Sequence, residues 1–272
     1  AAGYRILELG GNAVDAGVAS GIAINVTLPH ATSFGGVAPI AIFLSSSNSV
    51  LTISGLGRWP QAASIDYFKM NCGNEIPKGI LRSVVPSAPD AWLTALRLYG
   101  TMSFEEVATP ALELAEQGFP ISPYLQSSIE KAHLAQPLWK STQAIFMPNK
   151  RIMKTGEVLV QLDLANTFKR LIEVERHNQH RGRMEAIKAV RDFFYKGDIA
   201  KEIEAFSADE GGLITGEDLG RFTVKIEKPV IGRFREYSVY TCGAWSQGPV
   251  VAQTLQIVQN DDLESMGHNS PD

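Results

Sequence analysis

The sequence offers few side chains whose types and spacing belong to a known reaction centre. Its five histidines are scattered along the chain: His30, His133, His177, His180 and His268. None has the HExxH spacing of a zinc protease, and the chain contains no GxSxG nucleophile motif, no P-loop and no GxGxxG dinucleotide fingerprint. We therefore expect no catalytic residue in this chain, no metal and no other cofactor.

Arg58 is the residue best suited to binding a ligand. It lies in the segment SGLGRWPQAAS, directly after an apolar run that predicts a β-strand. A loop at the carboxyl end of a strand is a favourable place for ligand contacts, and a guanidinium fork matches a carboxylate. The alternative is an arginine at the surface or a buried structural arginine, with no ligand to bind.

A second candidate binding loop contains Ser246, Gln247 and Gly248, in the sequence TCGAWSQGP. Polar side chains next to glycine and proline suit substrate contact, and they suit a plain turn before the last helix equally well. Trp59 and Trp245 flank the two candidate loops, where they either line an acyl pocket or pack in the core.

Two helices joined at a glycine pair are predicted at the start of the chain, over residues 1–9 and 12–26. Asn12 is the expected N-cap of the second helix, and Asp15 places a carboxylate near its positive end. The many small residues of this helix, AVDAGVASGIA, favour close packing against another layer.

Strands and further helices follow. The runs 37–44 and 50–54 predict a β-hairpin, and the continuous apolarity of the first run predicts burial on both faces. Later strands are expected over 222–226 and 234–242, across a turn at Gly232. The expected later helices cover residues 86–98, 103–118, 123–134, 163–175, 184–195 and 248–259, and the polar, basic segment 177–183 is expected at the surface.

Composition limits the classes of protein. With 272 residues, 44% hydrophobic and 20% charged, the chain can bury a large core, and we expect one continuous α/β body with a mainly helical excursion at about 75–200. The 25 basic residues do not exceed the 29 acidic ones, which argues against a nucleic-acid partner. No apolar run is long enough for a membrane span. No export signal is visible, which favours the cytoplasm over the periplasm without deciding between them.

Several ordered blocks of the sequence resemble the gamma-glutamyltransferase family, over nearly the whole chain. They are ILELGGNAVDAGVASGIAINVTLPHATSFGG, VPSAPDAW, PALELAEQGFPIS, GEVLVQLDLANTF, FYKGDIAKEI, GGLITGEDLGRFTV and TCGAWSQGPVVAQTLQI. The versions GRWP and WSQGP are closer to the transferase-like amidohydrolase and acylase branch than to typical glutathione-processing members.

The resemblance implies an N-terminal nucleophile hydrolase with a four-layer αββα sandwich. Family precursors cut themselves into two subunits, and the threonine freed on the small subunit attacks an amide carbonyl. Residues 1–272 then form the large-subunit part of one αββα domain, and we expect further residues beyond both ends. The implied partners are the small subunit from the same precursor and a small-molecule amide substrate, either gamma-glutamyl or a related acyl amide; a dimer of large and small pairs is compatible with this.

Arg58 is implied to bind a substrate carboxylate, although the family's arginine lies in a differently spaced loop, shifted by two residues relative to the following proline. Ser246, Gln247 and Gly248 are implied to border the same substrate. A non-catalytic homologue that serves as an assembly scaffold is the alternative function.

Overall fold

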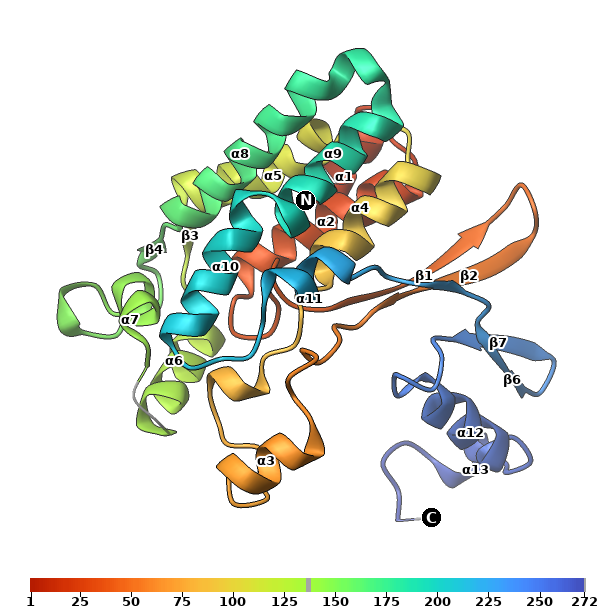
Figure 1. The fold of residues 1–272 in the computed structure, drawn as a ribbon. Helices are drawn as coiled ribbons and strands as arrows, with labels where there is room; N and C mark the ends of the chain where they lie inside the picture. The colour runs from red at the N-terminus through yellow and green to blue at the C-terminus, as the bar shows by residue number, and fades with distance from the viewer. Residues whose placement is uncertain (136–137, 272) are drawn as a thin grey trace.

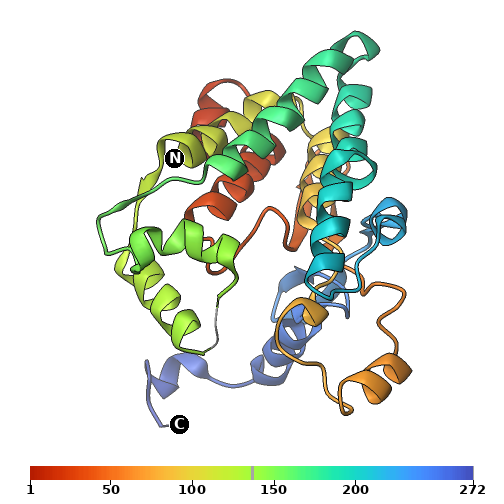
Figure 2. The same cartoon turned by 60° about the vertical axis from the view of Figure 1, so that its left-hand side comes forward.

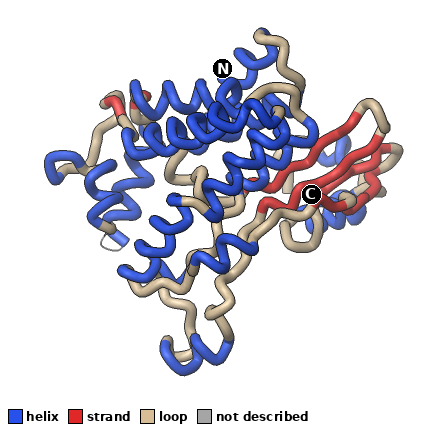
Figure 3. Tube along the Cα trace, turned by 45° about the horizontal axis from the view of Figure 1, so that its top comes forward, coloured by secondary structure: helices blue, strands red, loops and turns tan. Residues whose placement is uncertain are grey.

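The computed structural model describes residues 1–135 and 138–271, with most helices packed together and the longer strands on one side of them (Figures 1 and 3). The helices are α1 (Ala2–Glu8), α2 (Ala13–Thr27), α3 (Ile65–Asn71), α4 (Ala88–Tyr99), α5 (Phe104–Gln117), α6 (Pro123–Ala135), α7 (Lys140–Phe146), α8 (Leu162–Asn178), α9 (Arg183–Lys196), α10 (Asp198–Asp209), α11 (Gly216–Arg221), α12 (Gly248–Val258) and α13 (Leu263–Met266), with 3₁₀ turns η1 (Ile80–Arg82), η2 (Pro148–Lys150) and η3 (Gln179–Arg181). The strands are β1 (Ala38–Leu44), β2 (Ser49–Gly55), β3 (Phe119–Pro120), β4 (Val158–Leu159), β5 (Ile226–Glu227), β6 (Val230–Phe234) and β7 (Tyr237–Thr241). No helix in the described part of the chain combines the length and apolarity needed to cross a bilayer.

The predicted N-terminal helix pair is confirmed, and so is its cap. The side-chain oxygen of Asn12 accepts hydrogen bonds from the amides of Val14 and Asp15 at 2.8 and 3.0 Å, and the Asp15 carboxylate accepts from the Asn12 amide at 2.8 Å. Asp15 also accepts from Thr101 and is fully buried. Burial alone would raise the pKa of Asp15, but these hydrogen bonds outweigh it and lower the pKa. The cap therefore also anchors α2 to the segment before α5.

The strands of the described residues form a three-stranded sheet, in the order β1-β2-β5, and two two-stranded sheets, β3-β4 and β6-β7. The predicted hairpin of β1 and β2 is confirmed, with Ala38 opposite Gly55 and Leu44 opposite Ser49. The prediction that the first strand is buried on both faces is wrong. Ala38 and Ile42 are buried, whereas Phe43 is 61% exposed, because only one face of β1 packs on the helices.

Helices dominate from α4 to α10, and α8 and α9 form a long antiparallel pair (Figure 2). The predicted capping box of α5 is confirmed: the Glu106 carboxylate accepts from the Ser103 amide at 2.8 Å, and the Ser103 hydroxyl accepts from the Glu106 amide at 3.2 Å. Phe104, Phe168 and Tyr195 are fully buried between these helices. Whether the chain forms part of a single αββα domain stays a prediction.

The C-terminal strands depart from the predicted turn. Gly232 lies inside β6 opposite Val239, and the chain reverses after Phe234, where Arg235 has a φ of 54°. Gly232 is instead a point of close approach, because a Cβ there would lie 2.7 Å from the Cβ of Ala252 in α12. The expected strand over 222–226 is shorter than predicted and begins only at Ile226.

Candidate functional site

Arg58 lies, as predicted, in the loop that leaves the carboxyl end of β2. The Val85 amide donates to the Arg58 carbonyl at 2.9 Å, and the Gln61 amide donates to the Asp218 carboxylate at 2.9 Å. Although burial alone would raise it, the pKa of Asp218 is lowered by the hydrogen bonds from Gln61 and Thr215. The loop is thus tied to two other segments, which fixes the backbone that carries Arg58.

A segment from the last third of the chain lies beside the end of β2. The Ser54 amide donates to the Lys225 carbonyl at 2.9 Å, and the Lys225 amide donates to the Ser54 hydroxyl at 2.9 Å. β5 continues this pairing, with Glu227 opposite Thr52. The pairing brings Lys225 and Glu227 to the loop that carries Arg58.

A buried ion pair between two helices holds the backbone just before Lys225. Asp90, fully buried in α4, pairs with Arg191 of α9 and accepts a hydrogen bond from the Val224 amide at 2.8 Å. Arg191 also donates to the Phe222 carbonyl. Burial alone would lower the pKa of Arg191, but its hydrogen bond and ion pair with the Asp90 carboxylate outweigh burial and raise the pKa, so Arg191 stays charged. The pair therefore fixes the backbone immediately before Lys225.

Together with Trp245 from the loop after β7, the two segments line an open cleft of about 360 Å³. Its lining consists of Ser54, Leu56, Gly57, Arg58, Thr223, Lys225, Glu227 and Trp245. The Trp245 indole Nε1 donates to Oε2 of Glu227 at 2.7 Å. Among the described residues, no hydrogen bond or ion pair engages the Arg58 guanidinium, so its fork is open to a carboxylate.

The second predicted loop connects β7 to α12. The Ser246 hydroxyl donates to the Gly243 carbonyl at 2.9 Å and accepts from the Gly248 amide at 3.1 Å, so it stabilises the turn. Gly248 is required for close approach, since a Cβ there would lie 2.8 Å from the Cβ of Thr241. Gln247 is exposed. Ser246, Gln247 and Gly248 stand outside the cleft lining, and their neighbour Trp245 joins their loop to it.

The Trp59 ring and the Cys242 thiol, which both lie near the two loops in sequence, add no group to the cleft. The Trp59 ring packs edge-on against Phe68 of α3, with ring centroids 6.1 Å apart, and does not line the cleft. Burial and the neighbouring Glu227 carboxylate raise the pKa of the Cys242 thiol, which disfavours a reactive thiolate. No three His, Cys, Asp or Glu side chains gather into a metal-binding group within the residues described.

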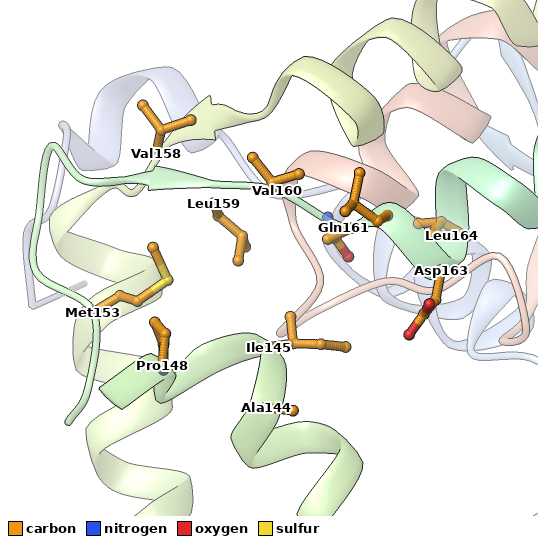
Figure 4. A pocket seen from close by; sticks show the side chains of 11 residues that line it. Ala144, Ile145, Pro148, Met153, Val158, Leu159, Val160, Gln161, Asp163 and Leu164 are labelled. Carbon is orange, nitrogen blue, oxygen red and sulfur yellow. The ribbon is translucent and has the colours of Figure 1, made fainter. Parts of the chain in front are cut away.

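A larger hollow, of about 460 Å³, lies where α7 and η2 meet β4 and the start of α8. Figure 4 shows Ile145, Met153 and Leu159 pointing toward one another across it. The Gln161 amide donates to the Val26 carbonyl at 2.9 Å and so serves the fold. Because most of the residues that line this hollow are apolar, the Arg58 cleft is the better candidate for polar recognition.

Sequence reasoning did not single out Lys225, Glu227 or Asp90. The alternation in TVKIE carried a usable signal, because a strand period of two places Thr223, Lys225 and Glu227 on one face. The strand that pairs with this segment is β2, however, and the Glu227 carbonyl accepts a hydrogen bond from the hydroxyl of Thr52, 175 residues away. No local pattern indicates such a contact.

Comparison with known proteins gives a family match over the whole chain. The family model described as gamma-glutamyltranspeptidase matches residues 1–272. The glutathione hydrolase proenzyme of Escherichia coli is 33% identical over 276 residues, covering 99% of this chain and 45% of that protein. The acylase ACY 1 proenzyme of Pseudomonas sp. (strain V22) is 32% identical over 286 residues, covering 100% and 48%. The chain spans about half the length of the curated relatives it matches.

Solved structures give the same result for the fold. The gamma-glutamyltranspeptidase of Helicobacter pylori superposes with a TM-score of 0.87 at 30% identity, covering 99% of this chain and 74% of that one. The cephalosporin acylase of Bacillus halodurans superposes with a TM-score of 0.85 at 26% identity, covering 98% and 48%. The predicted N-terminal nucleophile hydrolase fold class is confirmed, with this chain supplying one part of it.

Proposed function

The chain belongs to the gamma-glutamyltranspeptidase family, and from that premise we propose that it is the large subunit of an amide hydrolase or acyltransferase matured by cleavage of its own precursor. The companion small subunit supplies an N-terminal threonine, whose hydroxyl attacks the amide carbonyl while its α-amino group accepts the proton. The present chain contributes one wall of the substrate pocket. Relatives named as proenzymes of a glutathione hydrolase and of an acylase support this division.

The observation that carries the proposal is the open guanidinium of Arg58 in a cleft whose backbone is fixed. Its fork binds the carboxylate of the substrate's acyl portion, and the Lys225 ammonium adds a second positive charge. Glu227, held at one oxygen by Trp245, offers its other oxygen to a substrate cation. A gamma-glutamyl amide carries both a carboxylate and an ammonium group and so matches all three side chains, whereas other carboxylate-bearing acyl amides match Arg58 and Lys225 only.

Ser246, Gln247 and Gly248 complete the proposed substrate wall beyond Trp245. The turn stabilised by Ser246 and Gly248 carries the exposed Gln247 two residues after Trp245, which lines the cleft. A side-chain amide both donates and accepts hydrogen bonds, which suits the polar end of an amide substrate.

Mass spectrometry tests the proposal against the alternative of a non-catalytic assembly scaffold. The protein is purified after expression of its whole gene, and its polypeptides are weighed. We expect two polypeptides, the second beginning with threonine. A single uncut chain would instead support a non-catalytic scaffold.

A substrate panel then resolves the acyl group. The rates of hydrolysis of gamma-glutamyl, glutaryl and oxamate-like amides show which acyl group the enzyme prefers. The first two carry their carboxylate several bonds from the scissile amide, whereas the third carries it directly beside the scissile carbonyl. Fast turnover of neutral acyl amides alone would contradict the role given to Arg58.

A further inference from the structure

Ser87 is a buried residue with a hydroxyl group that its own helix does not use. Its side chain is fully buried, and the residue stands at the N-cap position of α4. Serine at this position usually accepts a hydrogen bond from an amide of the first helical turn, but the Ser87 side chain accepts none. The amides of Ser87 and Ala88 instead both donate to the Gly36 carbonyl at 2.9 Å. The start of the helix is therefore held by a backbone carbonyl, and the Ser87 hydroxyl serves another contact.

That contact is with the end of β2. The Ser87 hydroxyl donates to the Gly55 carbonyl at 2.7 Å and lies 3.3 Å from the Gly36 carbonyl. The chain turns sharply at Gly55, because the Leu56 amide donates to the carbonyl two residues earlier. The Gly55 carbonyl belongs to the planar peptide that links Gly55 to Leu56, so the hydroxyl fixes the orientation of this peptide. It is the first peptide of the loop that carries Arg58.

The segment around Ser87 holds the same loop at two further points. The Val85 amide donates to the Arg58 carbonyl at 2.9 Å. Gly57 lies so close to this segment that an added Cβ would overlap the Val85 carbonyl oxygen. Residues 85–87 therefore hold the loop backbone at Gly55, Gly57 and Arg58, and the Ser87 hydroxyl is the one side-chain group that takes part.

We propose that Ser87 is a positioning residue for Arg58: its hydroxyl sets the direction in which the loop leaves β2, and thereby the place of the guanidinium in the cleft. This assignment rests on the function proposed for Arg58, and Ser87 itself lies outside the cleft lining. Without the hydroxyl, the peptide after Gly55 is free to rotate, and the guanidinium samples positions that do not match a carboxylate. Binding of charged substrates weakens, whereas neutral acyl groups do not use Arg58 and bind as before.

Steady-state kinetics of the protein expressed from its whole gene tests this role, with glutaryl and pentanoyl p-nitroanilides as matched charged and neutral substrates. Ser87→Ala should raise KM for the glutaryl anilide about fivefold, the effect of one net hydrogen bond, and leave the pentanoyl anilide nearly unaffected. In an Arg58→Ala background the same change should add nothing, because the group through which Ser87 acts is gone. An additive loss in the double variant would show that Ser87 serves only the fold.

Ser207→Ala is the matched control for loss of a buried hydroxyl. Ser207 is also buried and also bonds to backbone, since its hydroxyl accepts from the Ile214 amide at 3.0 Å, but it lies in α10 and outside the cleft lining. Its removal should lower the midpoint of thermal unfolding without changing the preference for the glutaryl anilide. Ser87→Cys keeps the side chain's shape and a weak donor, and its KM should fall between those of the wild type and Ser87→Ala.

Calorimetric titration with glutarate makes the same comparison without turnover. The Kd of glutarate should rise about fivefold in Ser87→Ala and should be equal in Arg58→Ala and in the double variant. If Arg58→Ala leaves glutarate binding and the substrate preference unchanged, the function proposed for Arg58 fails, and this inference fails with it. If Arg58→Ala removes the preference for a carboxylate and Ser87→Ala retains it, only the role of Ser87 is overturned.

Discussion

At the scale of single residues, the role proposed for Arg58 depends on its guanidinium, which makes no hydrogen bond or ion pair with the described residues. The carbonyl of Arg58 is bound by Val85, whereas its guanidinium has no partner among the described residues. A buried structural arginine engages its fork with protein groups, as Arg191 does, whereas Arg58 is exposed and its fork is left to solvent or to a ligand. Arg58 thus has a fixed backbone and an unused charge, the combination that a binding residue needs.

Replacing Arg58 with alanine should raise KM for a carboxylate-bearing amide by about 10- to 100-fold, since a hydrogen-bonded charge pair contributes about 1.5–3 kcal/mol. KM for a neutral acyl amide should change little. Steady-state kinetics on matched substrates measures both. Lys228→Ala, an exposed cation just beyond β5 and outside the lining, controls for general loss of positive charge. Equal effects of Arg58→Ala on charged and neutral substrates would contradict the assignment.

At the scale of elements, the cleft depends on contacts between distant segments. Asp90 in α4 and Arg191 in α9 fix the backbone at Phe222 and Val224, which in turn places Lys225 beside β2. The stability of this one pair is therefore linked to the geometry of the binding site, although neither side chain lines the cleft.

Asp90→Asn should destabilise the protein by about 3 kcal/mol, because it leaves the mostly buried Arg191 without its counter-charge. It should also raise KM for the charged substrate, through displacement of Lys225. Denaturant unfolding and kinetics measure the two effects, and a double-mutant cycle with Arg191→Gln isolates the coupling. Glu217→Gln, which breaks the exposed pair with Arg221, is the control and should leave stability nearly unchanged. Normal stability of Asp90→Asn would exclude this role.

The sequence predicts the local parts of this fold well and its long-range pairings poorly. The caps at Asn12 and Ser103 are confirmed because each lies within a few residues of the amides it serves. The turn at Gly232 is predicted wrongly because its glycine serves packing against α12, not chain reversal. Arg58 lies on the predicted loop, but Lys225 reaches it through a pairing with Ser54, 171 residues away, which no local pattern encodes.

At the scale of the whole molecule, one side of the chain lacks a cover within the described residues. β1 lies at an edge of its sheet, and Phe43 on its outer face is 61% exposed. Beside it, an apolar groove of about 550 Å³ runs between β1, α2 and α4, with Val14 and Trp92 in its walls. An exposed strand edge beside apolar surface is a site for pairing with another polypeptide. The proposed small subunit fits this need.

Hydrogen–deuterium exchange should then show that the β1 amides that point away from β2 are strongly protected only when the small subunit is present. Amides of β2, which lies between β1 and β5, should be protected in both cases and provide the internal control. The comparison uses the two-subunit protein and the separately expressed large chain. Equal exchange of β1 in both would show that the small subunit does not cover this edge.

The open edge of β1 also gives a physical reason for making the proposed large and small subunits as one polypeptide. A free chain with this edge can add to the edge of another copy and begin an aggregate, in a process that accelerates with concentration. A tethered second half is present at an effective concentration of about millimolar, far above that of any neighbouring copy in solution. Synthesis in tandem thus favours intramolecular capping over polymerisation, and cutting the link only after folding would preserve that advantage.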